Sequence, residues 1–188
     1  SYIASKLPPL DAFAQELTKT DLLIIGDVLP DSVEPGVWEM VEKAVSRDGL
    51  TVVIIPGRQS MPHEFQSAIL SGLLPVKEFS PRVAEQFQKS ALDSPPTSYH
   101  LKLSADAFHL PMFQLSDSMT LRDPTLTELP GHQWIYGGIP KSGATLWASS
   151  RISGDSSAVV PTIVHHDYGF GQVVWMGIDS TWRWRMRS

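Results

Sequence analysis

The fold is decided by one stretch of the sequence, Thr51-Val52-Val53-Ile54-Ile55-Pro56-Gly57. Consecutive β-branched residues favour a strand, and the Pro-Gly pair that follows them ends it. A continuous apolar run, unlike an alternating one, is typical of a strand that is covered on both faces. The stretch therefore predicts a strand at the centre of a mainly parallel sheet.

Apolar patterns before and after this stretch alternate between helix and strand. Residues 11–20 and 63–72 have helical spacing, and residues 21–27 form a second short apolar run that ends at Asp27. Another helix is predicted between the two runs, with Asp31 or Ser32 as its cap and Asp48-Gly49 as its end. Its apolar face is made by Val37, Trp38, Val41, Ala44 and Val45. The order α, β, α, β, α predicts an α/β front half.

The rear half is less regular and more antiparallel in character. Between residues 77 and 143 the only alternating segment is 99–103, and Pro and Gly interrupt the rest. A further strand is predicted at 144–149. The runs 159–165 and 172–178 flank a turn with Gly169 and Gly171, which predicts a hairpin. These two glycines are interpreted as turn residues, because no G-x-G-x-x-G pattern surrounds them.

The bulk composition limits the classes of function. The chain has 188 residues, a length that suits one domain, and a net charge of -5 that gives no electrostatic reason to bind nucleic acid. It has no cysteine, which excludes disulfides, thiolate metal sites and a cysteine nucleophile. No apolar run approaches the roughly 20 residues that span a bilayer. The abrupt ends of the chain lead us to expect a single domain, residues 1–188, cut from a longer protein.

Polar residues follow the two predicted parallel strands, at the edge where open α/β sheets keep their sites. Asp27 can be an acid, a cation ligand or a residue that caps a turn, and the last is the commonest use of an aspartate in this place. Arg58 lies in the neighbouring loop. Ser60 follows a strand and precedes a helix, but the G-x-S-x-G pattern of a nucleophile elbow is absent. A serine hydrolase would need Ser60 to meet His63 or His166, together with Asp27 or Asp179.

Two further segments carry unusual side chains. His165-His166-Asp167 is the densest titratable cluster, but alternation along a strand would send the two imidazoles to opposite faces, so they would not share one metal. In the segment from Trp182 to Arg187, arginines alternate with Trp182, Trp184 and Met186. If extended, it would place Arg183, Arg185 and Arg187 on one face, either to bind an anion or acidic partner or to cover buried Trp rings.

Several motifs occur in the order of a known family. They are Ile25-Gly26-Asp27-Val28, the run from Gly49 to Gly57, Met61-Pro62, Leu73-Leu74-Pro75-Val76, and the run from Tyr168 to Arg185 that ends in Trp182-Arg183-Trp184-Arg185. The chain resembles the class I glutamine amidotransferase-like domain of large bacterial membrane-associated proteins that also carry a von Willebrand factor type A domain. The resemblance implies a three-layer, mostly parallel, flavodoxin-like sheet with an added antiparallel C-terminal hairpin.

The catalytic residues of that family are missing here. Active members place a Cys in the strand-to-helix elbow and a His-x-Glu pair after a later strand, where this chain has Gly57 and Asp179-Ser180-Thr181. The resemblance therefore implies a pseudoenzyme that binds other domains of its parent protein or a protein partner. No cofactor, metal, nucleic acid or membrane span is expected, and the location would be a soluble part of a membrane-anchored bacterial protein. The candidate binding residues are Asp27, Arg58, Asp179, Trp182, Arg183, Trp184 and Arg185, and the alternative is the serine hydrolase described above.

Overall fold

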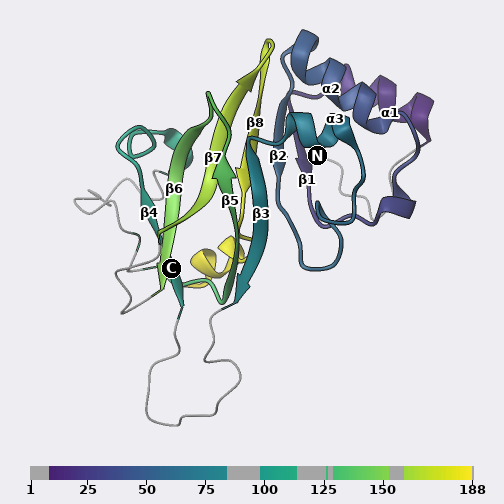
Figure 1. Cartoon of the computed structure of the whole chain (residues 1–188). Coiled ribbons are helices and arrows are strands. Elements are labelled where there is room, and N and C mark those ends of the chain that lie inside the picture. Colours follow the sequence, from purple (N-terminus) through teal and green to yellow (C-terminus); the bar gives the residue numbers. More distant parts are fainter. Residues whose placement is uncertain (1–8, 84–97, 114–125, 127–128, 153–158, 188) are drawn as a thin grey trace.

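A computed structural model describes residues 9–83, 98–113, 126, 129–152 and 159–187 of the chain (Figure 1). The elements in chain order are α1 (Leu10–Leu17), β1 (Leu22–Ile25), η1 (Pro30–Ser32), α2 (Val37–Asp48), β2 (Thr51–Ile54), α3 (Ala68–Leu73), β3 (Val76–Val83), β4 (Tyr99–Leu103), η3 (Pro111–Phe113), β5 (Trp134–Pro140), β6 (Thr145–Ile152), β7 (Val160–Tyr168), β8 (Gly171–Met176) and η4 (Thr181–Arg187), where η marks a 3₁₀ helix.

The main sheet has six strands in the order β1-β2-β8-β7-β6-β4, and β3 pairs with β5 in a separate two-stranded ribbon. β1, β2 and β8 are mutually parallel, with Ile25 opposite Ile54 and Ile54 opposite Trp175. From β8 to β4 every neighbouring pair is antiparallel. The sheet thus has a short parallel end and a longer antiparallel end, which meet at β8.

The parallel end forms where continuous apolar runs predicted it. α2 buries Val37, Trp38, Val41, Ala44 and Val45, the apolar face read from the sequence, and Gly49 ends the helix with φ of 83°. Its N-cap is Gly36 rather than Asp31 or Ser32, because residues 30–32 form η1. The predicted hairpin is confirmed: β7 and β8 pair as far as Tyr168 and Gly171, and Gly169 adopts the φ of 64° that the turn requires.

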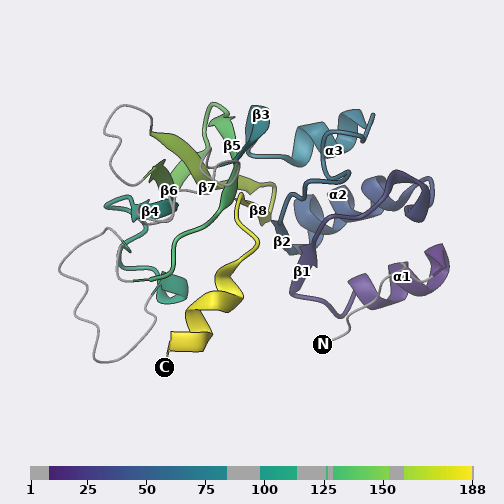
Figure 2. The same cartoon turned by 90° about the horizontal axis from the view of Figure 1, so that it is seen from below.

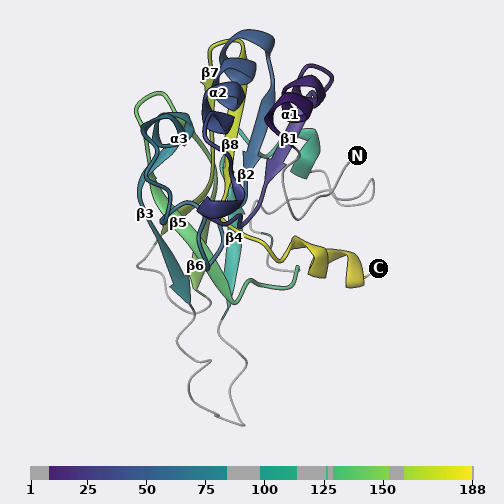
Figure 3. The same ribbon diagram turned by 90° about the vertical axis from the view of Figure 1, so that its right-hand side faces the viewer.

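The two faces of the sheet are covered by different structures. The α-helices share one buried cluster with Val52, Ile54, Val173 and Trp175, so they lie on the same face, and Figure 3 shows α2 between α3 and α1. The β3–β5 ribbon continues this layer across β7. On the opposite face a second cluster joins Leu101, Ile163 and Val174 to residues of non-strand segments, among them Ala107, Phe113 and Ile178. Figure 2 shows the ribbon and η4 on opposite sides of the sheet.

The expected three-layer, mostly parallel, flavodoxin-like sandwich is therefore wrong. Such a fold needs helices on both faces of a parallel sheet, whereas here the α-helices of the described residues lie on one face and the sheet is rich in antiparallel pairs. The continuous run of β1 misled the interpretation, because Leu22 and Ile24 remain 51% and 58% exposed. The class I amidotransferase-like architecture fails as a description of the layers for the same reason.

Several elements depart from the expected pattern in the middle of the chain. β3 and β5 were not predicted, since Pro81 in one and Gly137-Gly138 in the other obscure the strand signal. The helix predicted over 63–72 is reduced to α3, with Ser67 as a cap that accepts a hydrogen bond from the N–H of Leu70. Among the described residues, no helix combines the length and the apolar character that crossing a bilayer requires.

Candidate functional site

The carboxyl ends of the parallel strands bring three loops to one edge of the sheet. β1 leads to Asp27, β2 leads to Gly57 and the loop that follows it, and β8 leads to Asp179. Because these strands run in the same direction, their loops lie along the same edge. The loops differ in how many of their polar groups form hydrogen bonds within the protein.

Asp27 closes the loop after β2. Its Oδ1 accepts hydrogen bonds from the N–H groups of Ser60 at 2.9 Å and Met61 at 2.8 Å, and its Oδ2 accepts one from Gln59 at 2.8 Å. A Cβ on Gly57 would lie 1.9 Å from Cγ of Asp27, so only glycine fits beside this carboxylate. The expected cap was for the segment that directly follows Asp27, whereas the carboxylate binds the loop after the neighbouring strand.

Protonation of Asp27 follows from the same contacts. Partial desolvation acts to raise its pKa, but the hydrogen bonds from Met61, Gln59 and Ser60 favour the ionised form, as does the charge of His63. The balance lowers the pKa of Asp27 below its ordinary value. The residue is therefore a carboxylate at neutral pH, committed to backbone groups of its own chain.

Ser60 is not placed as a nucleophile. Its side chain is 1% exposed, and its Oγ donates a hydrogen bond to Oε2 of Glu64 at 2.6 Å. His63 lies nearby, but its Nδ1 is 3.2 Å from the hydroxyl oxygen of Tyr136. In the described part of the chain no hydrogen bond joins Ser60 to a histidine. Arg58, in the same loop, is exposed.

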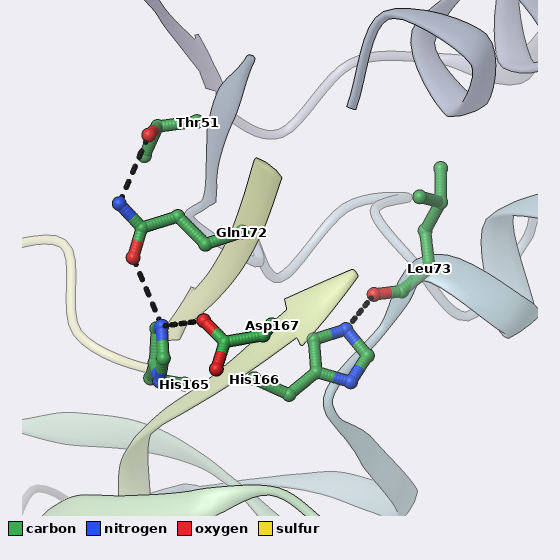
Figure 4. Close-up of polar contacts among 6 residues, drawn as sticks. All are labelled: Thr51, Leu73, His165, His166, Asp167 and Gln172. Atoms are coloured by element: carbon green, nitrogen blue, oxygen red, sulfur yellow. Dashed lines mark hydrogen bonds and ion pairs between the residues drawn. The ribbon is translucent and has the colours of Figure 1, made fainter. Parts of the chain in front are cut away.

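The histidine pair on β7 is divided between the two faces of the sheet, as alternation along a strand predicts. His165 Nε2 lies 2.9 Å from Oε1 of Gln172, whose Nε2 donates to Oγ1 of Thr51, so a polar chain crosses three strands (Figure 4). The ring of Trp147 stacks on His165 with centroids 4.5 Å apart. On the other side, Nε2 of His166 donates to the carbonyl oxygen of Leu73 at 2.8 Å.

These contacts make the pair part of the packing rather than a metal site. Burial, chiefly, lowers the pKa of His166, which keeps its imidazole neutral. The carboxylate of Asp167 is 87% exposed and lies 3.5 Å from His165 Nε2. No group of three or more histidine, aspartate or glutamate side chains that could hold a metal ion occurs within the described ranges.

The edge beyond β8 is open instead of closed. A pocket of about 320 Å³ lies where β8 leads into η4, opposite the start of β5. It is lined by Gln133, Trp134, Asp179, Ser180, Trp182 and Arg183. Two opposite charges, two indole rings and two neutral polar side chains thus surround one small volume.

Ser180 is held in this pocket by a buried histidine. His132 is 2% exposed, its Nδ1 lies 2.7 Å from Oγ of Ser180, and the ring of Trp184 packs edge-on against it at 5.6 Å. Burial, with smaller effects of Arg183 and His100, lowers the pKa of His132 to about 4. A shift from 6.5 to about 4 disfavours the imidazolium by roughly 3 kcal/mol. His132 therefore positions the Ser180 hydroxyl but is a poor acceptor for its proton.

The two charged groups of the pocket remain unpaired with each other. Arg183 donates from Nη1 to the carbonyl oxygen of Gly131 at 2.8 Å, a bond that fixes the guanidinium but does not neutralise it. Asp179 is exposed, and within the described part of the structure its carboxylate takes part in no hydrogen bond or ion pair. The side chain of Trp182 is 60% exposed beside them.

The structure separates the candidate residues into three groups. Asp179, Trp182 and Arg183 line the pocket. Trp184 lies behind it and donates from Nε1 to the carbonyl oxygen of Pro130 at 3.2 Å. Asp27 and Arg58 belong to the β1–β2 end, and the side chain of Arg185 lies outside the described residues.

The condition under which the arginines would share one face is not met in the Trp and Arg segment. Residues 181–187 form η4, not an extended strand, so alternate residues do not share a face. Sequence reasoning also missed His132, Gln133, Trp134 and Ser180. Two signals could have found Ser180, namely its place two residues after the predicted strand 172–178 and its position in the stretch that corresponds to the His-x-Glu pair of the amidotransferase family.

Comparisons with known proteins concern the fold alone. No family model matches the sequence, and no curated protein matches it significantly. The structure is similar to the cytoplasmic protein STM1381 from Salmonella typhimurium LT2, with a TM-score of 0.58, 17% identity, and coverage of 91% of this chain and 65% of that one. It is also similar to the cytoplasmic protein STM3548 from Salmonella typhimurium, with a TM-score of 0.56, 15% identity, and coverage of 88% and 63%.

Other matches are weaker. Gan42B, a GH42 β-galactosidase from G. stearothermophilus, has a TM-score of 0.49 over 21% of its chain. We infer nothing about this chain from a similarity of that size. None of these proteins bears on the amidotransferase-like resemblance or on a von Willebrand factor type A domain. What the comparisons establish is that this chain shares the fold of the two Salmonella proteins and spans less than two thirds of their length.

Proposed function

We propose that this domain is a non-catalytic binding module of a larger, envelope-associated protein, and that its ligand occupies the pocket at the end of β8. The observation that supports this best is the pocket itself, where Asp179 and Arg183 carry opposite charges that no described side chain neutralises. Concave sites with a few convergent polar groups among aromatic side chains are where small ligands bind. A group from another domain or from a protein partner, the class of ligand expected from the sequence, would meet the same charges.

The chemistry of the candidate nucleophiles supports a non-catalytic role. Ser60 is buried and bonded to Glu64. Ser180 faces a histidine that resists protonation, and Arg183 adds a positive charge beside it instead of the carboxylate that orients a catalytic histidine. General-base catalysis needs a pKa near the working pH, and about 4 is far below it.

A serine-dependent hydrolase is the second candidate, and one observation favours it. The 2.7 Å distance between Ser180 Oγ and His132 Nδ1 is that of a hydroxyl and its base. Ser180, rather than Ser60, would then be the nucleophile. Turnover measurements separate this candidate from the binding module.

The test has a catalytic arm and a binding arm. In the first, L-glutamine and p-nitrophenyl acetate are incubated with the wild-type domain, with Ser180→Ala and with Ser60→Ala. We expect the three proteins to be indistinguishable, and turnover that Ser180→Ala or Ser60→Ala abolishes would overturn the non-catalytic assignment.

In the binding arm, tryptophan fluorescence follows titration with a panel of small carboxylates, amines, amino acids and sugars. Compounds that occupy the pocket should perturb the emission of the wild type but not that of a variant in which both indoles of the lining are replaced, Trp134→Phe with Trp182→Phe. If no compound in any class does so, and a protein containing the neighbouring domains also leaves the emission unchanged, the assignment of the ligand to this pocket is wrong.

A further inference from the structure

The charges in the β8 pocket narrow the chemistry of what can fill it. The lining includes one carboxylate, on Asp179, and one guanidinium, on Arg183, while Gln133, Ser180 and both indoles are neutral. His132, behind Ser180, is neutral at physiological pH because its pKa is about 4, so it adds no second positive charge. The lining as a whole is therefore electrically balanced.

A ligand with a single charge would fit this balance poorly. An anion on Arg183 would leave the exposed carboxylate of Asp179 without a partner, and a cation on Asp179 would leave the guanidinium of Arg183 without one. Pairing both charges forms two sets of charge-assisted hydrogen bonds, whereas pairing one of them forms only one. A neutral ligand would pair neither. A molecule with one negative and one positive group satisfies both.

The available bonding positions agree with this requirement. A guanidinium has five N–H donors, and among the described residues the side chain of Arg183 uses one of them, in the bond from Nη1 to Gly131, so donors remain for a carboxylate. With no partner among the residues that the structure describes, the carboxylate of Asp179 can accept hydrogen bonds from an ammonium group. Trp182, which is 60% exposed, supplies a π face on which an ammonium or an apolar side chain can lie.

The volume of the pocket is compatible with a small ligand. About 320 Å³ is at the lower end of the range for small-molecule sites. A single amino acid or a compound of similar size fits this volume.

We propose that the pocket of Asp179, Ser180, Trp182 and Arg183 binds a small zwitterion of amino-acid type, with its carboxylate on Arg183 and its ammonium on Asp179. The inference rests on the proposed function, since it names the ligand class of the same site. Ser180, positioned by His132, offers a further hydrogen bond to the carboxylate end.

The experiment compares ligands that differ by one charge. Wild-type domain is titrated by calorimetry with each of the common L-amino acids, and the tightest binder is then compared with its deaminated acid and its decarboxylated amine. We expect the zwitterion to bind about tenfold to a hundredfold more tightly than either, the usual value of one charged hydrogen-bonded contact.

Matched variants assign each charge to its residue. Asp179→Asn should remove the preference for the zwitterion over the deaminated acid, and Arg183→Gln should remove the preference over the amine. Asp31→Asn and Arg47→Gln change exposed charges outside the pocket and should alter neither. Melting temperatures confirm folding, and Arg183→Met, which also removes the charge, serves if Arg183→Gln is unfolded.

The outcomes distinguish the two proposals. Suppose that a sugar or a simple anion binds, that Trp182→Ala abolishes this binding, and that no amino acid competes for the site. The zwitterion inference is then overturned, while the proposal of a binding module stands. If an amino acid binds with equal affinity to wild type and to both pocket variants, the site is elsewhere and the inference is also overturned. If no compound of any class binds, both the zwitterion inference and the proposed small-ligand site are wrong.

Discussion

Asp27 and Asp179 each follow the carboxyl end of a parallel strand in the same sheet, yet the first carboxylate is bound by its own chain and the second has no partner among the described residues. Asp27 accepts three backbone hydrogen bonds from the loop after β2. Asp179, beyond β8, has no such partner in the described part of the chain and lines a pocket with Arg183. The two aspartates therefore differ in their contacts although each lies beyond the carboxyl end of a parallel strand.

The difference teaches that the loop, not the strand end, decides whether such a residue is available to a ligand. At the β1–β2 end, Gly57 lets the chain approach so closely that the loop wraps around the Asp27 carboxylate. At the β8 end, η4 leads away from the strand and leaves an open volume. The first end is internally satisfied and stabilises the fold, and the second has charges that remain for a partner.

The largest expected effect on stability comes from replacing Asp27 by alanine, and replacing Asp179 in a separate variant serves as its comparison. Asp27→Ala should lower the free energy of unfolding by roughly 3 kcal/mol, because three backbone N–H groups lose a charged acceptor and only partly regain water. Asp179→Ala should change it by less than about 0.5 kcal/mol, as for an unengaged surface residue. Urea denaturation at pH 7 measures both, and equal losses would refute the contrast between a closed and an open end.

The second effect is a pH dependence of the free energy of unfolding, which arises from His132 behind the β8 pocket. Its folded pKa, about 4, is below the ordinary 6.5, so the unfolded chain binds the proton more strongly and stability falls as pH drops through this window. Between pH 7 and pH 5 the loss should be about 2 kcal/mol. His166, whose pKa is also lowered, adds to the same direction.

His132→Asn isolates this contribution, because the Asn side chain can still meet Ser180 while it does not titrate. The slope of unfolding free energy against pH should become shallower between pH 7 and pH 5 in the variant. Asp27 does not interfere, since its lowered pKa makes its contribution disappear only below its ordinary value of 3.8. An unchanged slope would show that His132 does not carry the effect.

The smallest effect separates the two tryptophans of η4. Trp184→Phe keeps the ring against His132 but removes the hydrogen bond to Pro130, which should cost about 1 kcal/mol. Trp182→Phe alters a mostly exposed ring and should leave thermal stability unchanged. Differential scanning calorimetry of both variants measures the two effects. A larger loss of thermal stability for Trp182→Phe than for Trp184→Phe would mean that the Trp182 ring is packed against the protein rather than available to a ligand.

The local elements followed from the sequence wherever a single residue pattern was enough. Consecutive β-branched residues define β2, the spacing from Val37 to Val45 defines α2, and Gly169 marks the β7–β8 turn. These signals depend on backbone preference and on the period of burial, which neighbours in the chain determine. Asp179, Trp182 and Arg183 could likewise be selected as unusual residues after a strand.

Tertiary structure alone decided how these parts combine. An apolar run does not specify which faces will be covered, and so β1 could be predicted as a strand while the exposure of Ile24 could not. The pocket joins residues 133–134 to residues 179–183 through a contact between β5 and the end of β8, which no local pattern encodes. Whether an aspartate is satisfied depends on the loop beside it in space, so the free carboxylate of Asp179 and the engaged one of Asp27 became distinguishable only when the chain was folded.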